Sequence, residues 1–350
     1  MKIDGMLSQL SEWLLGEGQE NDIVISSRIR LARNLTGFPF ITRATEQDRR
    51  SIRDTVQNVA SEMFEKDSFY FVDLELLDSL DRTYLCERQL ISRELVETDG
   101  ARAALIDRNE KFCIMVNEED HLRIHGMTSG FDPEKVWSRI NEVDDKLESR
   151  LQYAFHNKYG YLTACPTNVG TGMRVSVMLH LPALVVSKEI DKVFRSLQKV
   201  NLAVRGIYGE GSQPVGDFYQ ISNQATLGRT EMELIEKVNN IVPQIVAYER
   251  QARDFLFKER YEIILDRCSR AMGLLKTART ISSIETMHHL SSIRLGINMG
   301  LLEEPDIPVI NDLFLNTQPA HLQKHNGNEL SQTERDIARA KYLRHKLGEK

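Results

Sequence analysis

Three adjacent carboxylates, Glu118, Glu119 and Asp120, lie in the segment NEEDHLR (residues 117–123), which directly follows the apolar run Phe112–Val116. Carboxylates this close repel one another, so their charges are costly unless a cation or a ligand offsets them. A solvated acidic turn would give the same pattern without any function. A zinc site is disfavoured because the spacing H-E-x-x-H is absent. The segment is therefore a candidate functional site, with the solvated turn as the alternative.

Cys165 opens a second candidate segment, CPTNVGTG (residues 165–172), and Arg174 follows it on the next apolar run. One proline and two glycines predict a rigid turn whose backbone can approach a ligand closely. A lone cysteine is most often a small buried apolar residue. At a strand end beside cations it can instead be a thiolate. Spacing alone leaves both interpretations open.

Arginines recur at the ends of the apparent strands: Arg28, Arg30, Arg123, Arg174 and Arg205. Arg28 and Arg30 are two residues apart in SSRIR, so on an extended segment they project to the same side. A surface salt bridge is the default for any single arginine. Together, beside glycine turns, they suit a triphosphate, because guanidinium groups bind phosphate oxygens bidentately. The glycine-rich segment RGIYGEG (residues 205–211) also carries Glu210.

The usual nucleotide-binding signatures are absent from the sequence. It has no G-x-x-x-x-G-K-[ST] loop, no G-x-G-x-x-G after a strand, and neither H-R-D nor D-F-G. If the chain binds ATP, it must hold the phosphates by other means, and the arginines are the candidates.

Composition places the chain among soluble globular proteins. With 350 residues, 41% hydrophobic and 27% charged, two domains are expected. A net charge of −6 argues against a general nucleic-acid binder but not against arginine-bearing substrates. Four scattered cysteines without a C-x-x-C pair indicate neither a disulfide framework nor a zinc site. No secretory signal is visible and the most apolar stretch is too short to cross a bilayer, so we expect a cytoplasmic protein without membrane contact.

The pattern of apolar residues predicts an α+β chain. Apolar and β-branched runs predict strands at residues 112–116, 161–164, 173–181, 202–208 and 218–221. Asp132 and Pro133 open an amphipathic helix, whose apolar face carries Val136, Ile140, Val143, Leu147 and Leu151. Ser187 is predicted to begin another helix, with Ile190, Val193, Phe194 and Leu197 on its inner side.

Strand signals fade from about Thr230 onward. Capping boxes at Ser282/Glu285 and Ser331/Glu334 predict two late helices. Pro243 is expected to bend or interrupt a helix. The expected organisation is a mixed sheet with flanking helices over residues 1–255, followed by a helical domain over residues 256–350.

Five segments in the same order resemble the catalytic domain of the phosphagen (guanidino) kinases: SSRIR, NEEDHLR, CPTNVGTG with Arg174, RGIYGEG, and YQISN followed by LGRTE. The resemblance covers roughly residues 20–255. It implies a largely antiparallel mixed sheet flanked by helices, and transfer of a phosphoryl group from ATP, with Mg²⁺, to a guanidinium.

The chain as a whole is more similar to the bacterial protein-arginine kinases of the McsB family. Small-molecule phosphagen kinases have about a hundred residues of helical domain before the SxRxR segment, which here begins at Ser26. The extra helical part follows the catalytic domain instead. It carries Arg335, Asp336 and Arg339 in RDIARA, which resembles the element that binds phosphoarginine in that family. By spacing alone, these residues are also typical of a solvated, salt-bridged helix face.

The resemblance also implies roles for individual residues. It assigns the ATP phosphates to the five arginines named above, the catalytic carboxylate to Glu119 with Glu210 as its partner, and a reactive cysteine beside the acceptor guanidinium to Cys165. Two carboxylates can fix the plane of a guanidinium while one of them takes its proton. Two departures from the phosphagen kinases concern ATP: Met178 replaces a histidine that contacts adenine, with His180 two residues further, and Gln224-Ala225-Thr226 replaces an arginine pair.

The resemblance implies a protein-arginine kinase that marks proteins for degradation in a stress response. It implies a heat-shock repressor among the protein substrates, a zinc-binding activator protein, a Clp protease, and a homodimer or higher homo-oligomer. Three alternatives remain: a small-molecule guanidino kinase acting on free arginine, a guanidino-group hydrolase, and a non-catalytic adaptor that binds phosphoarginine.

Overall fold

The computed structural model describes residues 10–65, 67–206 and 215–348. Glu210, one of the two predicted catalytic carboxylates, lies outside the described residues.

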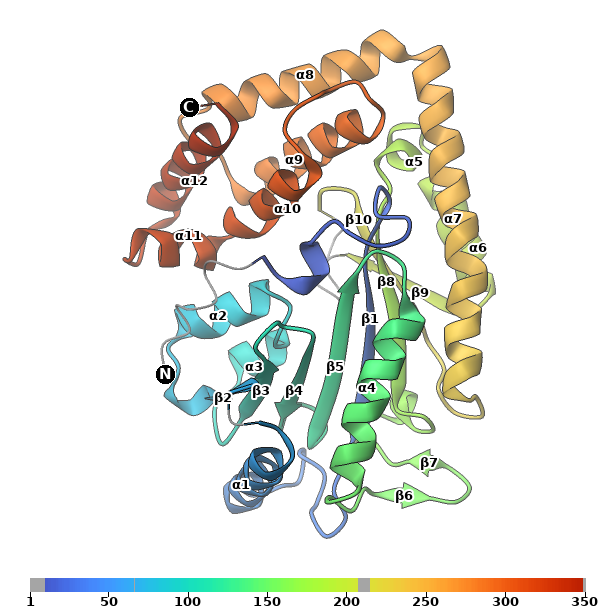
Figure 1. Cartoon of the computed structure of the whole chain (residues 1–350), viewed down its shortest axis with the longest axis vertical. Helices are drawn as coiled ribbons and strands as arrows, with labels where there is room; N and C mark the ends of the chain where they lie inside the picture. Colours follow the sequence, from blue (N-terminus) through green and yellow to red (C-terminus); the bar gives the residue numbers. More distant parts are fainter. Residues whose placement is uncertain (1–9, 66, 207–214, 349–350) are drawn as a thin grey trace.

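An eight-stranded sheet forms the centre of the described part of the chain (Figure 1). Its strands are β1 (Val24–Arg33), β2 (Phe69–Asp73), β3 (Ala103–Asp107), β4 (Phe112–Val116), β5 (Leu122–Ser129), β8 (Met173–His180), β9 (Leu202–Gly206) and β10 (Phe218–Asn223). They lie in the order β2-β3-β4-β5-β1-β8-β10-β9, and each neighbouring pair is antiparallel. A separate hairpin pairs β6 (Phe155–His156) with β7 (Gly160–Tyr161).

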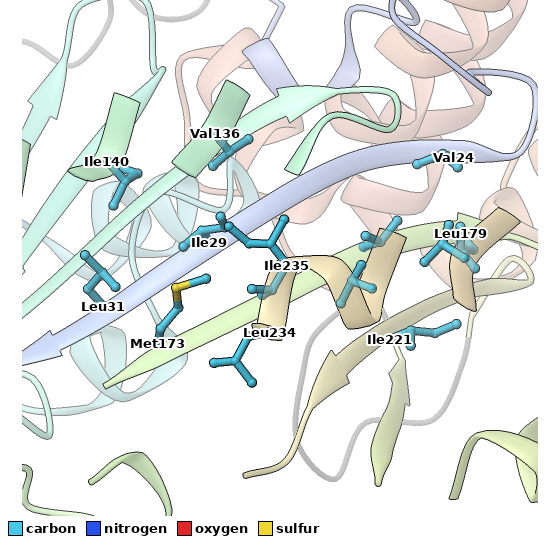
Figure 2. Close-up of a cluster of buried hydrophobic side chains, with 14 of the residues drawn as sticks. Val24, Ile29, Leu31, Val136, Ile140, Met173, Leu179, Ile221, Leu234 and Ile235 are labelled. Carbon is cyan, nitrogen blue, oxygen red and sulfur yellow. The ribbon is translucent and has the colours of Figure 1, made fainter. Parts of the chain in front are cut away.

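The sheet has one apolar face, which forms the main core. Side chains alternate between the two faces of a strand, so Ile29 and Leu31 of β1 point away from Arg28 and Arg30. Figure 2 shows Ile29 and Leu31 beside Met173 of β8. Helices α4 (Pro133–Glu148) and α7 (Glu231–Glu259) pack on this face, and Figure 1 shows α4 in front of the sheet and α7 along its right-hand side.

Helix α4 forms as its sequence predicts. The side chain of Asp132 accepts a hydrogen bond from the backbone N–H of Lys135 at 2.9 Å, and Pro133 occupies the first turn. The residues of its predicted apolar face are buried: Val136, Ile140, Val143 and Leu147 within the helix, and Leu151 just beyond its end.

The C-terminal helices pack against one end of the opposite sheet face. They are α8 (Tyr261–Thr277), α9 (Ser283–Asn298), α10 (Ile307–Asn316), α11 (Pro319–Asn326) and α12 (Gln332–Leu347). Their apolar residues form a second core with residues of the sheet and of the N-terminal segment, among them Trp13, Met127, Met178 and Phe218. Figure 1 shows these helices above one end of the sheet.

The remaining α-helices of the described part of the chain are α1 (Glu46–Met63), α2 (Ser79–Glu87), α3 (Arg93–Glu97), α5 (Pro182–Val186) and α6 (Ile190–Lys199). The predicted α+β fold with a helical C-terminal part is confirmed. No helix within the described ranges is both long enough and apolar enough to span a membrane.

Two local predictions are wrong, and one of the two effects expected of Pro243 is excluded. Of residues 161–164 only Tyr161 belongs to a strand, because the chain turns into the segment that carries Cys165. Ser187 caps the C-terminal end of α5, and α6 begins only at Ile190. Pro243 does not interrupt α7, since the buried residues before and after it pack on the sheet and hold the helix together.

Both late helices begin at the predicted serine. Ser331 forms the complete capping box with Glu334. Ser282 accepts a hydrogen bond from the backbone N–H of Glu285 at 3.2 Å. Helix α7 runs across the predicted domain boundary at residues 255/256, and the division of the chain at that point stays a prediction.

Candidate active site

The face of the sheet opposite the main core carries the predicted phosphate-binding arginines. Across β1 and β8, Arg30 lies directly opposite Arg174. Across β1 and β5, Arg123 lies opposite Ala32, which follows Arg30 on the same face. Directly opposed residues share a face of the sheet, so three strands place these arginines side by side.

Arg205 joins the same face through a second set of pairs. It lies opposite Gln220 of β10, which lies opposite Met178 of β8. Met178 in turn lies opposite Ser26, two residues before Arg28 on the same face of β1. The strand register therefore brings together on one face residues that are far apart in the sequence.

The positive charges of Arg28 and Arg30 lie in a crowded, desolvated part of this cluster. Burial, followed by the charges of Arg28 and Arg174, holds the pKa of Arg30 well below its usual range. Burial also lowers the pKa of Arg28 to about 10. The buried Nε atoms of Arg28 and Arg30 have no hydrogen-bond partner among the residues that the structure describes. A polyanion placed here would supply both the missing negative charge and the missing acceptors, so the cluster fits a triphosphate.

A pocket of about 120 Å³ joins the arginine cluster to the two other candidate segments. Arg30, Arg123 and Arg174 line it together with Glu119 and Cys165. Other parts of its wall are Leu31, Ala32, Thr167, Asn168 and Gly172. Residues from three motifs far apart in the sequence thus surround one small polar space.

The acidic segment is a tight turn between β4 and β5. Asn117 adopts a left-handed conformation (φ 60°), and its side chain donates to the carbonyl oxygens of Arg49 (2.8 Å) and Ala101 (2.7 Å). Glu118 and Asp120 are buried at 3% and 0% exposure, so the turn is not a solvated one. These contacts fix the backbone that presents Glu119.

Arg123 offsets the negative charge of the turn. Its guanidinium lies 2.9 Å from Glu118 and 3.6 Å from Asp120, and it also pairs with Glu119. Glu119 is the more accessible carboxylate of the three, and it lines the pocket. Burial, and then the nearby Asp120, raise the pKa of Glu119, although Arg123 opposes the shift. A carboxylate with a raised pKa is a stronger base than an ordinary glutamate.

Asp120 connects the acidic turn to the cysteine turn. Its Oδ1 accepts hydrogen bonds from the backbone N–H of Ala164 and from Nδ2 of Asn34, both at 2.7 Å. Cys165 follows Ala164, is half-buried, and has its Sγ 3.0 Å from Oγ1 of Thr167. The thiol therefore faces the pocket and not the apolar core.

The segment Gln224-Ala225-Thr226, which stands in place of the arginine pair, contacts the backbone of the turn that carries Cys165. The hydroxyl group of Thr226 can donate to the carbonyl oxygens of Thr167 and Val169, which lie 2.9 Å and 2.7 Å from its Oγ1. This segment thus has a structural role here, in place of a charged contribution.

His180 and Met178 have different surroundings. His180 is fully buried, with its Nε2 2.9 Å from Oγ of Ser291 and its Nδ1 3.1 Å from the guanidinium of Arg294, both on α9. Met178 lines a small pocket beside Arg28, together with Trp13 and Gln89. Trp13 and Gln89 had no sequence signal, because neither belongs to a motif.

Arg335, Asp336 and Arg339 lie together near the beginning of α12, away from the pocket of Glu119. Arg339 is buried, and it donates to the carbonyl oxygens of Thr317 and Ile281 (both 2.8 Å) and to Oδ1 of Asp336 (2.5 Å). Arg335 is half-buried. Two of the three residues thus form an ion pair that is largely shielded from solvent.

No group of three or more histidine, cysteine, aspartate or glutamate side chains could hold a metal ion within residues 10–65, 67–206 and 215–348. The charged and nucleophilic side chains that line the pocket are those of three arginines, Glu119 and Cys165.

Two family profiles match the sequence. Residues 51–252 match the family described as ATP:guanido phosphotransferase, C-terminal catalytic domain. Residues 261–350 match the protein-arginine kinase McsB C-terminal domain.

Curated relatives match over nearly the whole chain. The protein-arginine kinase of Halothermothrix orenii is 45% identical, covering 97% of each chain. That of Symbiobacterium thermophilum is 45% identical over 96% of each chain, and that of Bacillus subtilis is 42% identical over 97% of this chain and 93% of its own.

Solved structures share the fold of the catalytic part. Lombricine kinase is 25% identical with a TM-score of 0.59, covering 70% of each chain. A duplicated taurocyamine kinase from Schistosoma mansoni with bound transition-state analogue components is 27% identical with a TM-score of 0.60. That match covers 72% of this chain and 36% of the duplicated kinase.

Proposed function

The chain belongs to the protein-arginine kinase family of ATP:guanido phosphotransferases, and from this premise we propose that it transfers the γ-phosphoryl group of ATP to arginine side chains of other proteins. The observation that carries the proposal is the pocket in which partly buried arginines meet Glu119 and Cys165. One side of this pocket suits an anion and the other suits a guanidinium.

Phosphoryl transfer depends mainly on positioning and on neutralising charge. ATP would enter as its Mg²⁺ complex, in which the ion would offset part of the phosphate charge. Arg30, Arg123 and Arg174 line the pocket and would hold the transferred phosphoryl group, while Arg28 and Arg205 extend the same basic face along the sheet. The crowded arginines are already in place before the substrate binds, so little reorganisation is needed.

The acceptor must lose a proton. A guanidinium has a pKa above about 12, so its nitrogens are poor nucleophiles. Glu119 would accept the proton as one nitrogen forms the N–P bond and the bond between the γ-phosphorus and the bridging oxygen of ADP breaks. Its raised pKa favours this role. Cys165, on the same wall, would contact the acceptor guanidinium and stabilise its positive charge.

A phosphorylation assay with an acid-stability step tests the proposal. The purified chain is incubated with γ-labelled ATP and either an unfolded arginine-rich protein or free arginine. We expect label in the protein band that acid removes, because an N–P bond is acid-labile and a phosphoserine ester is not. Label on free arginine alone would favour the small-molecule guanidino kinase. If the chain turned over no ATP, the non-catalytic phosphoarginine-binding adaptor would be favoured.

We propose further roles that rest on family resemblance. Arg335, Asp336 and Arg339 would bind phosphoarginine, with the arginines on the phosphoryl oxygens and Asp336 on the modified guanidinium. The phosphorylated proteins, a heat-shock repressor among them, would be marked for a Clp protease in a stress response. A zinc-binding activator protein and a homodimer or larger homo-oligomer belong to the same proposal.

A further inference from the structure

The C-terminal helix α11 rests on Glu87, the last residue of α2. Oε1 of Glu87 accepts a hydrogen bond from the backbone N–H of Ala320 at 2.9 Å. Its Oε2 accepts one from the backbone N–H of His321 at 3.1 Å and lies 2.7 Å from Nδ1 of the same residue. One carboxylate thus satisfies two backbone groups in the first turn of α11 and orients a side chain.

The contact between Glu87 and His321 is shielded from solvent. His321 is fully buried, and its ring packs against that of Tyr84, with centroids 4.4 Å apart and the planes tilted by 40°. Burial lowers the pKa of His321, so the neutral ring donates from Nδ1 to the carboxylate. Helices α2 and α11 are therefore joined by a fixed polar contact inside an apolar environment.

Two residues after Glu87, Gln89 contacts Arg28 on the face of the sheet that carries the arginines. Gln89 turns the chain in a left-handed conformation (φ 63°), and its Oε1 accepts a hydrogen bond from Nη1 of Arg28 at 3.4 Å. Gln89 and Arg28 line the same small pocket with Trp13.

The residue between Glu87 and Gln89 is fixed as well. Arg88 is buried at 1% exposure and pairs with Glu110 at 2.6 Å. Its carbonyl oxygen accepts a hydrogen bond from Nε1 of Trp13 at 3.3 Å. The backbone between Glu87 and Gln89 is therefore held on both sides by packed contacts.

We infer that Glu87 and Gln89 are positioning residues, through which helix α11 sets the side chain of Arg28 for ATP. This inference rests on the proposed function, which assigns Arg28 to the phosphates. The buried Nε of Arg28 has no hydrogen-bond partner among the described residues. The hydrogen bond from Nη1 to Gln89 therefore helps to restrict the rotamers of this long side chain. Without that contact, ATP itself must order the side chain, and this costs affinity. Chemistry after ATP has bound stays unchanged, because neither residue lines the pocket of Glu119.

Two variants and one control test the inference in the full chain. Gln89→Gly removes the acceptor without backbone strain, since glycine adopts a positive φ freely. Glu87→Gln replaces one acceptor oxygen by an NH₂ group opposite the donors of α11. The control is Asp81→Asn, because Asp81 also joins α2 to α11 through Lys324 but lies at the other end of α2.

The measurements are the Kd for ATP, followed by tryptophan fluorescence because Trp13 lines the pocket, and KM and kcat for ATP and for a protein substrate. We expect Gln89→Gly and Glu87→Gln to raise the Kd and KM for ATP about tenfold, roughly the effect of one lost hydrogen bond to a charged group. We expect kcat and the KM for the protein substrate to stay the same. Asp81→Asn should leave all four values unchanged.

The outcomes separate this inference from the proposed function. If the unchanged chain binds no ATP, the proposed function fails. If it binds ATP and Gln89→Gly binds equally well, the positioning role alone is overturned. An equal loss of ATP affinity in Asp81→Asn would also overturn it, since general packing of α2 on α11 would then be sufficient. If Glu87→Gln does not fold, Gln89→Gly decides the question by itself.

Discussion

Arg30 of β1 and Arg174 of β8 lie directly opposite each other across the sheet, so two guanidinium groups share one pocket wall. Like charges at directly opposed positions destabilise a pair of strands. The fold keeps this pair even though the pKa of Arg30 is held well below its usual range. Such a site is more stable when an anion occupies it than when it is empty.

The first prediction concerns the repulsion between the guanidinium groups of Arg30 and Arg174. In Arg30→Met, the protein without ligand should be as stable as the unchanged chain or more so, because one buried positive charge is removed. ATP stabilises a protein that binds it by about 2.7 kcal/mol at 100 times its Kd, and this gain should be lost in the variant. Thermal unfolding with and without Mg²⁺ and ATP measures both effects. Arg150→Met, which changes an exposed arginine, is the control and should keep the gain from ATP.

The second prediction assigns the general base. Glu119→Gln should lower kcat by about 10²–10⁴-fold and leave ATP binding measurable, because the amide cannot take the proton. In the unchanged chain, activity requires the deprotonated carboxylate, so it should fall as the pH drops through the raised pKa of Glu119. The acid limb of kcat should therefore lie above the pH at which an ordinary glutamate titrates, about 4.3. Full activity in Glu119→Gln would refute the assignment, and Glu142→Gln on the surface of α4 should behave as the unchanged chain.

The third prediction concerns the pocket thiol. Cys165→Ser should lower kcat by about 10²-fold, the cost of losing one electrostatic contact in an active site, without lowering the melting temperature. Thiol reagents should label Cys165 first, since burial raises the pKa of Cys86 and of Cys268 to about 11 and that of Cys113 further. Mass spectrometry of the labelled chain identifies the site. If Cys165 resists labelling and its serine variant is fully active, the thiol has no role in transfer.

The individual strands and helices around this site could be predicted from the sequence, but the pairing of the strands could not. The strands at Phe112–Val116, Met173–His180 and Phe218–Asn223 follow from local apolar and β-branched runs, and Asp132 marks the beginning of α4. Local patterns carry no information about which strands pair. The common face of Arg30, Arg123 and Arg174 is a property of the register.

Contacts with the C-terminal helices were also beyond prediction. His180 lies on the same strand and the same face as Met178, yet helix α9 covers it, with its Nε2 beside Oγ of Ser291. Trp13 and Gln89 come from segments without a motif, and only the packed structure places them beside Arg28. The alternation of side chains along β8 predicts one face for both His180 and Met178, but not which element covers it.

The fourth prediction tests the C-terminal element. Asp336→Ala should weaken binding of free phosphoarginine and spare ATP binding, because α12 lies away from the pocket of Glu119. Calorimetric titration with phosphoarginine and with ATP separates the two effects. Glu334→Gln, an exposed change in the same helix turn, is the control. Equal phosphoarginine affinity in Asp336→Ala would leave Asp336 with only its structural pairing to Arg339.

The fifth prediction follows from Glu249 of α7, a buried carboxylate that caps the first turn of α5. It accepts hydrogen bonds from the backbone N–H groups of Ala183 and Leu184, both at 3.0 Å, and from Arg253 at 3.1 Å. Burial, the largest cause, raises the pKa of Glu249 to about 7 in spite of these donors. In the unfolded chain the same group has a pKa of about 4.3.

The folded state of the unchanged chain therefore binds a proton that the unfolded state releases between about pH 4.3 and pH 7. The contribution of Glu249 to stability is fully present below this window and is lost as the pH rises through it. Glu249→Gln cannot titrate, so the difference in unfolding free energy between the two proteins should change by about 3 kcal/mol across the window, with the unchanged chain favoured at the acidic end. Denaturant titrations at pH 5, 6, 7 and 8 measure it, and a difference that does not vary with pH would show that Glu249 is already ionised in the fold.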